Sequence, residues 1–344
     1  MSKARWFSVR AGLSQRRRMI LGVFSFLLPL LIWSAVSYVP FVWHPKVLIT
    51  NPGDVDYMQV DMYVDKAMFA DELKNMRAEG KAVPEGIPVN PVYLPAPDQV
   101  AKAFYTAFTT APEQKDMPWL HESLWHSVKI IFWSFLLSSL IGVPLGIVCG
   151  AYGPISRLVE PFVEFFRYLP APAFGALAVA ILGIYDGPKI AIIVIGTLFQ
   201  QILIIANTTR KIDFTLLEAA MTLGTTPFKL ITKVVIPGVL PDLYRDQRIL
   251  LGWAWTYLIV AELIGTSSGI TWFITQQARY QHFDNVYAAI MMIGILGLGV
   301  DLLLARLGRK LFPWDQSQSK LGVDLLLARL GRKLFPWDQS QSKN

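Results

Sequence analysis

The sequence is poor in cysteine, histidine and charged residues, and each shortage excludes a class of function. Of its 344 residues one is a cysteine, Cys149, so neither a disulfide within the chain nor a site of several thiolates can form. The four histidines have no ligand-like spacing. There is also no glycine-rich phosphate loop, no nucleophile elbow and no metal-ligand cluster. We therefore expect no cofactor, no metal and no ATP hydrolysis by this chain itself.

Charged residues make up only 17% of the chain, whereas hydrophobic residues make up 53%. A soluble protein could not bury so much apolar surface, so the composition indicates a membrane protein. The formal net charge is +7. Because the lysines and arginines cluster at the ends of apolar runs rather than on one face, this charge indicates membrane topology and not nucleic-acid binding.

The apolar runs predict six membrane-spanning helices. Residues 1–18 are basic without any acid, and the run at 19–39 is long enough to cross a hydrocarbon core of about 30 Å. The positive-inside rule keeps this N-terminus in the cytoplasm, with a cleaved signal peptide as the alternative. The remaining runs are 128–151, 159–184, 189–206, 249–264 and 287–304, and they return the C-terminus to the cytoplasm. Pro170 and Pro172 should bend or shorten the third span.

Residues 40–118, between the first two spans, are polar, rich in proline and more acidic than basic, which fits an external segment. Two surface helices are predicted there, at Asp65 to Glu79 and at Pro97 to Thr109. Residues 43–93 have the character of an insertion. We interpret them as a solvated loop, with a docking surface or lid as the alternative.

A polar stretch at residues 213–242 separates the fourth and fifth spans, and it reads DFTLLEAAMTLGTTPFKLITKVVIPGVLPD. Asp213 suits the N-cap of a helix, and Gly224 suits the left-handed residue that ends it. Pro227, after Thr226, suits the first turn of a second helix. The stretch therefore predicts a helix, a sharp corner and a second helix, a shape that can enter a groove on a partner.

Five residues of this stretch, Glu218, Ala219, Ala220, Gly224 and Pro237, follow the pattern E-A-A, three residues, G, nine residues, I-x-L-P. Val234 for Ile and Ile236 for Leu are the only departures, and both keep an aliphatic side chain. The pattern resembles the cytoplasmic EAA loop of inner-membrane permeases in ABC importers. Matches at residues 94–97, 167–170 and 183–190 resemble the nitrate, sulfonate and taurine group of these permeases.

The resemblance implies an all-α integral membrane protein with the type I ABC importer permease fold, in the bacterial inner membrane. It implies a five-helix core at 119–312 that contains the coupling loop 207–247. It further implies a separate ATPase subunit, a second permease subunit of the same or another chain, and a periplasmic solute-binding protein. The solute would be small, an anion such as nitrate, a sulfonate or taurine. Closure of the ATPases would move the loop helices and rock the spans between two states.

Three residues in the spans are candidates for the solute path or its gate. Glu262 is an acid in an apolar run, and it either faces a path or reaches external water. Arg167 is either a fixed charge at the inner mouth or a positive-inside anchor, and Trp253 either lines the path or belongs to an aromatic belt. A membrane-embedded enzyme or a channel that uses Glu262 is the alternative function.

The tail at 313–344 contains an exact repeat, because residues 321–343 copy residues 298–320 letter for letter. Such identity indicates a recent tandem duplication or an error in sequence assembly. The first copy completes the sixth span. The second copy is shorter than the ~20 apolar residues of a span, so we expect it to lie on the membrane surface or to stay disordered.

Overall fold

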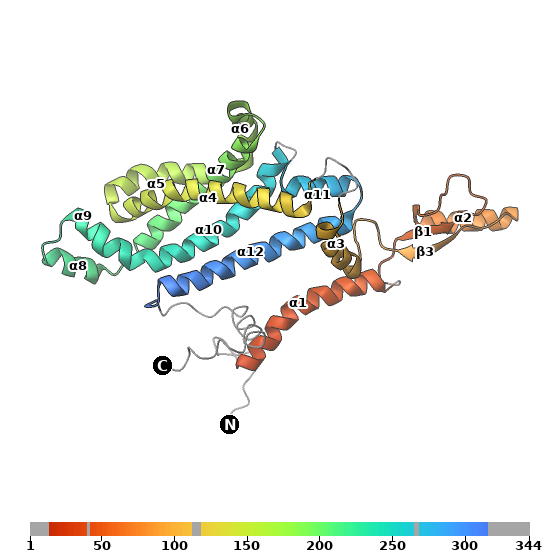
Figure 1. The fold of residues 1–344 in the computed structure, drawn as a ribbon, viewed down its shortest axis with the longest axis horizontal. Helices are drawn as coiled ribbons and strands as arrows, with labels where there is room; N and C mark the ends of the chain where they lie inside the picture. Colours follow the sequence, from red (N-terminus) through yellow and green to blue (C-terminus); the bar gives the residue numbers. More distant parts are fainter. Residues whose placement is uncertain (1–13, 40–41, 112–117, 265–267, 316–344) are drawn as a thin grey trace, which may run out of the picture. The chain divides into compact units, whose positions relative to one another are not determined.

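The computed structural model describes residues 14–39, 42–111, 118–264 and 268–315 (Figure 1). They form two compact units that divide between residues 100 and 101 and are described separately. Most of the predicted basic N-terminus and the second copy of the repeat lie outside the described residues.

The first unit begins with α1 (Gln15–Tyr38), an apolar helix that Ser14 caps by accepting a hydrogen bond from the Arg17 amide. Two side-chain hydrogen bonds tie the later segment around residues 90–95 to its far end. The indole of Trp33 donates to the Pro95 carbonyl at 3.1 Å, and the Asn90 amide donates to the Ser37 carbonyl at 3.2 Å. After the segment that follows α1, the chain therefore comes back into contact with α1 at residues 90–95.

That segment is a small folded domain, so the predicted loop at 43–93 is wrong, and so is the all-α fold class at this point. Strands β1 (Lys46–Asn51), β2 (Tyr63–Asp65) and β3 (Glu85–Val89) form an antiparallel sheet in the order β2-β1-β3. The helix α2 (Lys66–Glu79), which the sequence predicted, completes the domain. A separate hydrophobic core is made of Val47, Ile49, Val55, Met58, Val64 and Met76.

The sheet was missed because its strands are short and only a few residues alternate. In β1 the side chains of Val47 and Ile49 are buried while their neighbours are more exposed, the two-residue period of a half-buried strand. The surrounding prolines and acids masked this period. The register pairs Lys46 with Val89, so the chain enters and leaves the domain at the same place.

The second unit is helical in its described part, and the long helices α4, α7, α10 and α12 run side by side (Figure 1). In chain order the elements are α3 (Pro97–Thr109), α4 (Leu120–Ala151), α5 (Gly153–Arg167), η1 (Ala171–Phe174), α6 (Gly175–Leu182), α7 (Asp186–Thr209), α8 (Phe214–Thr222), α9 (Pro227–Leu230), η2 (Ile231–Val235), α10 (Ile236–Ile264), α11 (Ile270–Arg279) and α12 (Phe283–Leu311). The predicted helix at Pro97 to Thr109 is confirmed with the same bounds.

Four described helices, α1, α4, α7 and α12, are long and apolar enough to cross a membrane. The pair formed by α5 and the η1–α6 segment makes a fifth if it counts as one span, and it is bent by 86°. This bend confirms the effect predicted for Pro170 and Pro172, which cannot continue a helix. The predicted fifth span, 249–264, is the last part of α10, which is not among these helices. The count of six therefore stays a prediction.

Three glycines explain why α4 and α7 lie so close together. Gly142, Gly146 and Gly150 recur every four residues on α4 and face α7. A Cβ atom on Gly146 would lie 2.7 Å from the Cβ of Ile205, and one on Gly150 would lie 2.5 Å from the Cβ of Thr209. The two backbones can approach this closely only because these side chains are absent.

Candidate functional site

The segment between α7 and α10 folds as its local sequence predicts. Asp213 caps α8 by accepting a hydrogen bond from the Thr215 amide at 2.9 Å. At the other end Gly224 has φ +78°, the left-handed conformation that an L residue rarely adopts. The Gly224 amide donates to the Met221 carbonyl and the Thr225 amide to the Ala220 carbonyl, which together form a Schellman motif.

The second helix of the segment runs into α10 without a break. Pro227 occupies the first turn of α9, and a wider π-helical turn, Ile231–Val235, leads from α9 into α10. Pro237 follows this turn. Proline has no N–H to donate to the carbonyl four residues back, and its ring crowds that carbonyl. A wider π-helical turn before Pro237 accommodates both effects. Any displacement of α9 is therefore passed directly to α10.

The segment exposes far more apolar surface than a surface helix needs. None of the α8 or α9 residues is buried. Large apolar side chains with high exposure are Phe214 (64%), Leu216 (48%), Met221 (47%), Leu223 (87%) and Phe228 (76%). Glu218 and Ala219 are exposed beside them. A cluster of this kind on a corner is typical of a surface that contacts a protein or a membrane.

Leu217 of α8 faces inward, toward a cavity of about 270 Å³ between the segment and the bundle. The cavity is also lined by Pro227 and Ile231 and by the ends of α4 and α7 at Tyr152 and Arg210. The Arg210 guanidinium donates to Ser156 and pairs with Glu160 of α5. This pairing fixes the end of α7 that precedes the segment.

A row of polar contacts joins the two helices that flank the segment, α7 and α10, and connects both to α4. Near the segment the Thr208 hydroxyl donates to Asp246. Farther along, the fully buried Gln201 donates to Gln247 at 2.6 Å and to Ser139 at 2.9 Å. Buried polar groups that are paired across three helices fix the relative register of those helices. The three helices are thus held together beside the segment between α7 and α10.

At the other end of the second unit the carboxylate of Glu262 is buried, with an exposure of 2%. It accepts hydrogen bonds from the Ser127 hydroxyl of α4 and from the Thr271 amide, at 2.8 Å, at the start of α11. The Ser127 oxygen in turn accepts from the Ile270 amide. Glu262 therefore caps α11, and the interpretation in which it reaches external water is wrong. Sequence reasoning found no partner for it because Ser127 lies far away in the chain.

This arrangement requires a glycine at position 269, just before α11. Its φ is +102°, and a Cβ atom would lie 2.1 Å from a carboxylate oxygen of Glu262. Beside it, the buried Lys189 donates to the Ser268 carbonyl at 3.1 Å and to its hydroxyl at 2.8 Å, and it pairs with Asp186 at 3.2 Å. In the sequence, Lys189 belongs to the resemblance at residues 183–190 and is the first residue of the predicted span 189–206. A lysine at the edge of an apolar run gives no signal for this buried contact.

The other two candidates for the path lie apart from Glu262 in the fold. Arg167 is exposed at the end of α5, where its guanidinium donates to the Tyr168 hydroxyl at 3.0 Å and lies 4.8 Å from that ring's centre. Trp253 on α10 has 43% of its surface exposed. The structure does not bring these three residues together in one site.

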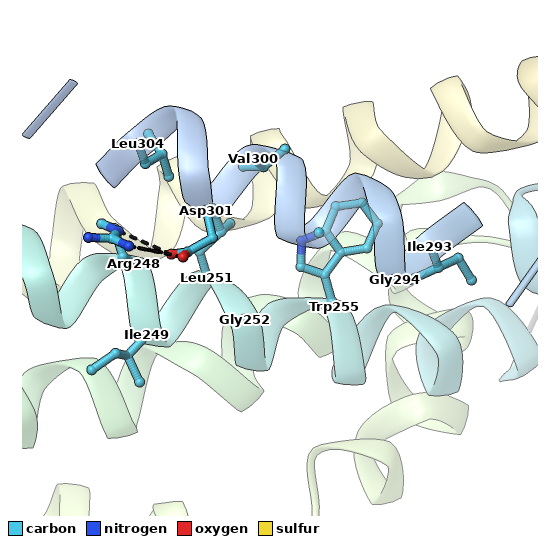
Figure 2. Close-up of a pocket in the computed structure, with 11 residues that line it drawn as sticks. Arg248, Ile249, Leu251, Gly252, Trp255, Ile293, Gly294, Val300, Asp301 and Leu304 are labelled. Atoms are coloured by element: carbon cyan, nitrogen blue, oxygen red, sulfur yellow. Dashed lines mark hydrogen bonds and ion pairs between the residues drawn. The ribbon is translucent and has the colours of Figure 1, made fainter. Parts of the chain in front are cut away.

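A groove between α10 and α12 was not anticipated from the sequence (Figure 2). Its volume is about 330 Å³, and apolar side chains and glycines line most of it. At one end Arg248 of α10 forms a bidentate pair with Asp301 of α12, with distances of 2.9 Å from Nη2 to both carboxylate oxygens. No pattern in the sequence connects two residues so far apart.

The groups that could bind a metal are dispersed. Within the described residues, no three side chains of histidine, cysteine, aspartate or glutamate are placed to hold an ion. Cys149, the single cysteine, is buried against α7 with an exposure of 1%.

The chain was compared with known protein families and proteins. The family described as binding-protein-dependent transport system inner membrane component matches residues 142–313. A probable ABC transporter permease protein of Brucella abortus is 32% identical over 190 residues, which cover 55% of this chain and 76% of the relative. The taurine transport system permease protein TauC of Escherichia coli is 28% identical, over 66% of this chain and 82% of the relative.

A solved structure shares the fold. The MetNI methionine ABC transporter, in an inward-facing conformation, contains a chain that superposes with a TM-score of 0.52 at 22% identity, over 57% of this chain and 98% of that one. The match covers nearly all of that chain and leaves much of the present one outside. Together with the exposed corner at Gly224, the family match shows that this chain belongs to the binding-protein-dependent transport inner membrane components and is a permease subunit of an ABC importer.

Proposed function

We propose that the segment from Asp213 to Pro237 is the coupling element on which a separate ATPase subunit acts, and that ATP is hydrolysed on that subunit. The observation that carries the proposal is the exposed apolar corner, with Leu223 at 87% and Phe228 at 76% exposure on either side of Gly224. A contiguous group of apolar side chains of this size, outside the spans, is typical of a surface that a protein partner covers. Glu218, Ala219 and Ala220 lie on the preceding helix and complete the surface.

The connection of this segment to the bundle supports a mechanism. α8 follows α7 after a short turn, and α9 continues into α10, so a push on the corner acts on both helices. Their polar contacts with α4 make the three helices move as one block. When the ATPases close, this block rocks and opens the outer side of the path. When they separate, the block returns and the solute leaves toward the cytoplasm.

The proposed topology has six spans with both termini in the cytoplasm. The five helices or helix pairs that are long and apolar enough support five of the spans, and the last part of α10 is the sixth. The coupling segment then lies on the cytoplasmic side and Glu262 near the periplasmic side. The small domain at 46–89 lies in the periplasm, as an insertion between the first two spans.

The partners follow from the same assignment. Two permease chains enclose the path, and two ATPase subunits contact the two coupling corners. A periplasmic solute-binding protein delivers the solute. Relatives whose names give a solute include the taurine transport permease, a putative aliphatic sulfonates transport permease of Bacillus subtilis and a bicarbonate transport permease of Synechococcus elongatus. We therefore propose a small anion as the solute, with Glu262, Trp253 and Arg167 as the residues to test for a role in the path.

The substitution Gly224→Val tests the coupling corner. A Cβ atom at Gly224 would meet no atom within 4 Å, so valine is not excluded by contact, and its effect comes from the positive φ. Forcing an L residue into that conformation costs about 1–2 kcal/mol, and the helix after the corner should turn away. We expect solute transport and solute-stimulated ATP hydrolysis by the assembled importer to fall, while membrane insertion is kept.

Gly299→Val is the matched control, because Gly299 also has no atom within 4 Å of a Cβ position and has no positive φ. It lies on α12, outside the coupling segment. Transport by this variant should equal that of the parent. Normal transport by the Gly224→Val importer would show that the corner has no part in coupling.

A further inference from the structure

The groove between α10 and α12 is lined by residues that follow one another along both helices (Figure 2). On α12 its wall extends from Ile293 to Leu304, roughly 16 Å of helix rise. On α10 the wall includes Gly252 and Trp255. The groove is therefore long and narrow, and it is parallel to a helix that is apolar enough to span the membrane.

The groove exists because glycines stand where side chains would fill it. Cβ atoms on Gly252, Gly294 and Gly297 would meet no atom within 4 Å. These three glycines differ from Gly146 on α4, because atoms of α7 occupy the space that a side chain at Gly146 would need. The space beside α12 is thus left open by the sequence and is not closed by packing.

The walls of the groove determine what can occupy it. Charged groups are confined to the Arg248–Asp301 pair at one end, where these two residues bond each other, and the indole N–H of Trp255 is the one other polar side-chain group of the lining. Water requires two to four polar partners and does not fill a space with apolar walls. Another helix is about 10 Å wide with its side chains and would lie over the groove without filling it. A hydrocarbon chain has the required width and polarity.

We infer that the acyl chain of a phospholipid from the inner leaflet occupies this groove, with its headgroup beside the Arg248–Asp301 pair. The chain lies along Gly252, Gly294 and Gly297, and its end reaches Trp255. The bilayer supplies acyl chains at high concentration beside every transmembrane helix. The volume of about 330 Å³ is within the range of ligand sites. The choice of the inner leaflet rests on the proposed topology.

A lipid at this place has a consequence for transport. It separates the part of α12 that precedes Asp301, from Ile293 to Val300, from α10. The ion pair, the Tyr244 hydrogen bond to the Leu304 carbonyl and the Phe312 ring hold the other end of α12 against α10. The lipid therefore fills the space into which the part from Ile293 to Val300 would move when the helices rearrange. Its removal should alter the packing of α12 and leave the three-helix block unchanged.

Filling the groove tests the inference. The permease, purified with its ATPase subunit in mild detergent, should retain a phospholipid in native mass spectrometry. Gly252→Leu and Gly294→Leu each place a side chain in the groove, and leucine also favours the helix. We expect each variant to lower the lipid-bound fraction by about tenfold or more, a factor that corresponds to about 1.4 kcal/mol of binding free energy.

Gly299→Leu is the matched control, because Gly299 is on α12, has no atom within 4 Å of its Cβ position and does not line the groove. This variant should keep its lipid. A parent complex without lipid, or groove variants that bind lipid as well as the parent, would overturn the inference. Because ATPase co-purification is scored in the same samples, loss of the lipid site is distinguished from failure of the proposed function.

A photo-reactive residue identifies the occupant in native membranes. Ile249, at the rim of the groove, has 59% of its surface exposed and can be replaced by benzoyl-phenylalanine. An adduct with the mass of a phospholipid, lost when Gly252→Leu is added, is expected. A cross-link to a second copy of this chain or to another protein would show that protein fills the groove and would refute the lipid.

Discussion

At the scale of single residues, the buried carboxylate of Glu262 is the group with the most demanding environment. It connects α10 to Ser127 of α4 and to the first turn of α11, and it is almost inaccessible. A buried acid is stable only if hydrogen bonds replace those it made with water. Glu262 satisfies this condition as a helix cap, with the α11 N-terminus supplying a favourable partial charge. This role is compatible with a gate only if α11 moves.

The substitution Glu262→Gln measures the value of this cap. Glutamine keeps the size of the side chain but has one acceptor oxygen, so it cannot accept from both the Ser127 hydroxyl and the Thr271 amide in the present geometry. Leaving one buried donor unsatisfied costs about 1–3 kcal/mol. We expect the purified importer to lose this much free energy of unfolding in a denaturant titration.

Glu164→Gln provides the comparison, because Glu164 is exposed on α5 and its replacement should change the free energy of unfolding by less than about 0.5 kcal/mol. Equal stability of the two variants would show that the carboxylate of Glu262 is not required as a cap. Altered transport by a Glu262→Gln importer of normal stability would instead favour a role in the path.

The residues that sequence analysis identified correctly are those whose conformation is determined within a few positions. Asp213 caps its own helix, and Gly224 ends it, as the local pattern requires. The residues whose roles it missed are positioned by contacts with residues far away in the sequence. Glu262 and Ser127 are 135 positions apart, and Arg248 and Asp301 are 53 apart. A single sequence contains no signal for such pairs, so their roles required the fold.

At the scale of elements, the sequence predicted the long helices and the bend between α5 and α6, because apolar runs and prolines act locally. It did not predict the sheet, whose strands of three to six residues are too short to show a clear period. The close approach of α4 and α7 had a signal that was not used, the glycines at 142, 146 and 150. Small residues every four positions are typical of closely packed transmembrane helices.

Gly146→Ala tests this contact between α4 and α7. The added methyl group would lie 2.7 Å from the Ile205 Cβ atom and 2.8 Å from the Ile202 carbonyl oxygen, and backbone atoms cannot move aside as a flexible side chain can. The helices must separate, which should lower the free energy of unfolding by about 1–3 kcal/mol.

The same change at Gly299 of α12 has the opposite expected sign. A methyl group there meets no atom within 4 Å, and alanine is favoured over glycine in a helix by up to about 1 kcal/mol. In denaturant titrations, the free energy of unfolding should therefore fall below that of the parent for the Gly146 variant and rise above it for the Gly299 variant. A stable Gly146→Ala protein would mean that α4 and α7 can separate without loss.

At the scale of the whole molecule, we expect the small domain at 46–89 to behave as an insertion that can be removed. It has its own core, and its first and last strand residues, Lys46 and Val89, are paired. Paired residues on adjacent strands lie about 5 Å apart, so a short linker can close the gap. Replacing residues 46–89 by a few glycines and serines should leave membrane insertion and ATPase binding at the parent level, measured by co-purification.

A partial deletion gives the matched control. Removing residues 46–65 deletes β1 and β2 and leaves Met76 of α2 without its core. This variant should be degraded in the cell, whereas the clean deletion should accumulate normally. If the clean deletion also fails to assemble, the domain is required for folding and is not an independent insertion.

The exact repeat at the end of the chain raises the question of which copy holds α12 in place. In the first copy Phe312, with an exposure of 7%, packs on Tyr244 of α10 with ring centres 5.6 Å apart. Asp315 lies 3.4 Å from Arg245 of α10. Because the first copy already makes these contacts, truncation after Lys320 should leave unfolding, ATPase co-purification and transport unchanged.

The combination of truncation with Phe312→Ala separates the two copies. Losing a buried phenylalanine ring should cost about 3–5 kcal/mol in either chain if only the first copy contacts α10. If the full-length Phe312→Ala protein is as stable as the parent while the truncated variant is not, the identical phenylalanine of the second copy, Phe335, has replaced it. A truncated chain with the native Phe312 that no longer binds the ATPase would show instead that the second copy has a structural role of its own.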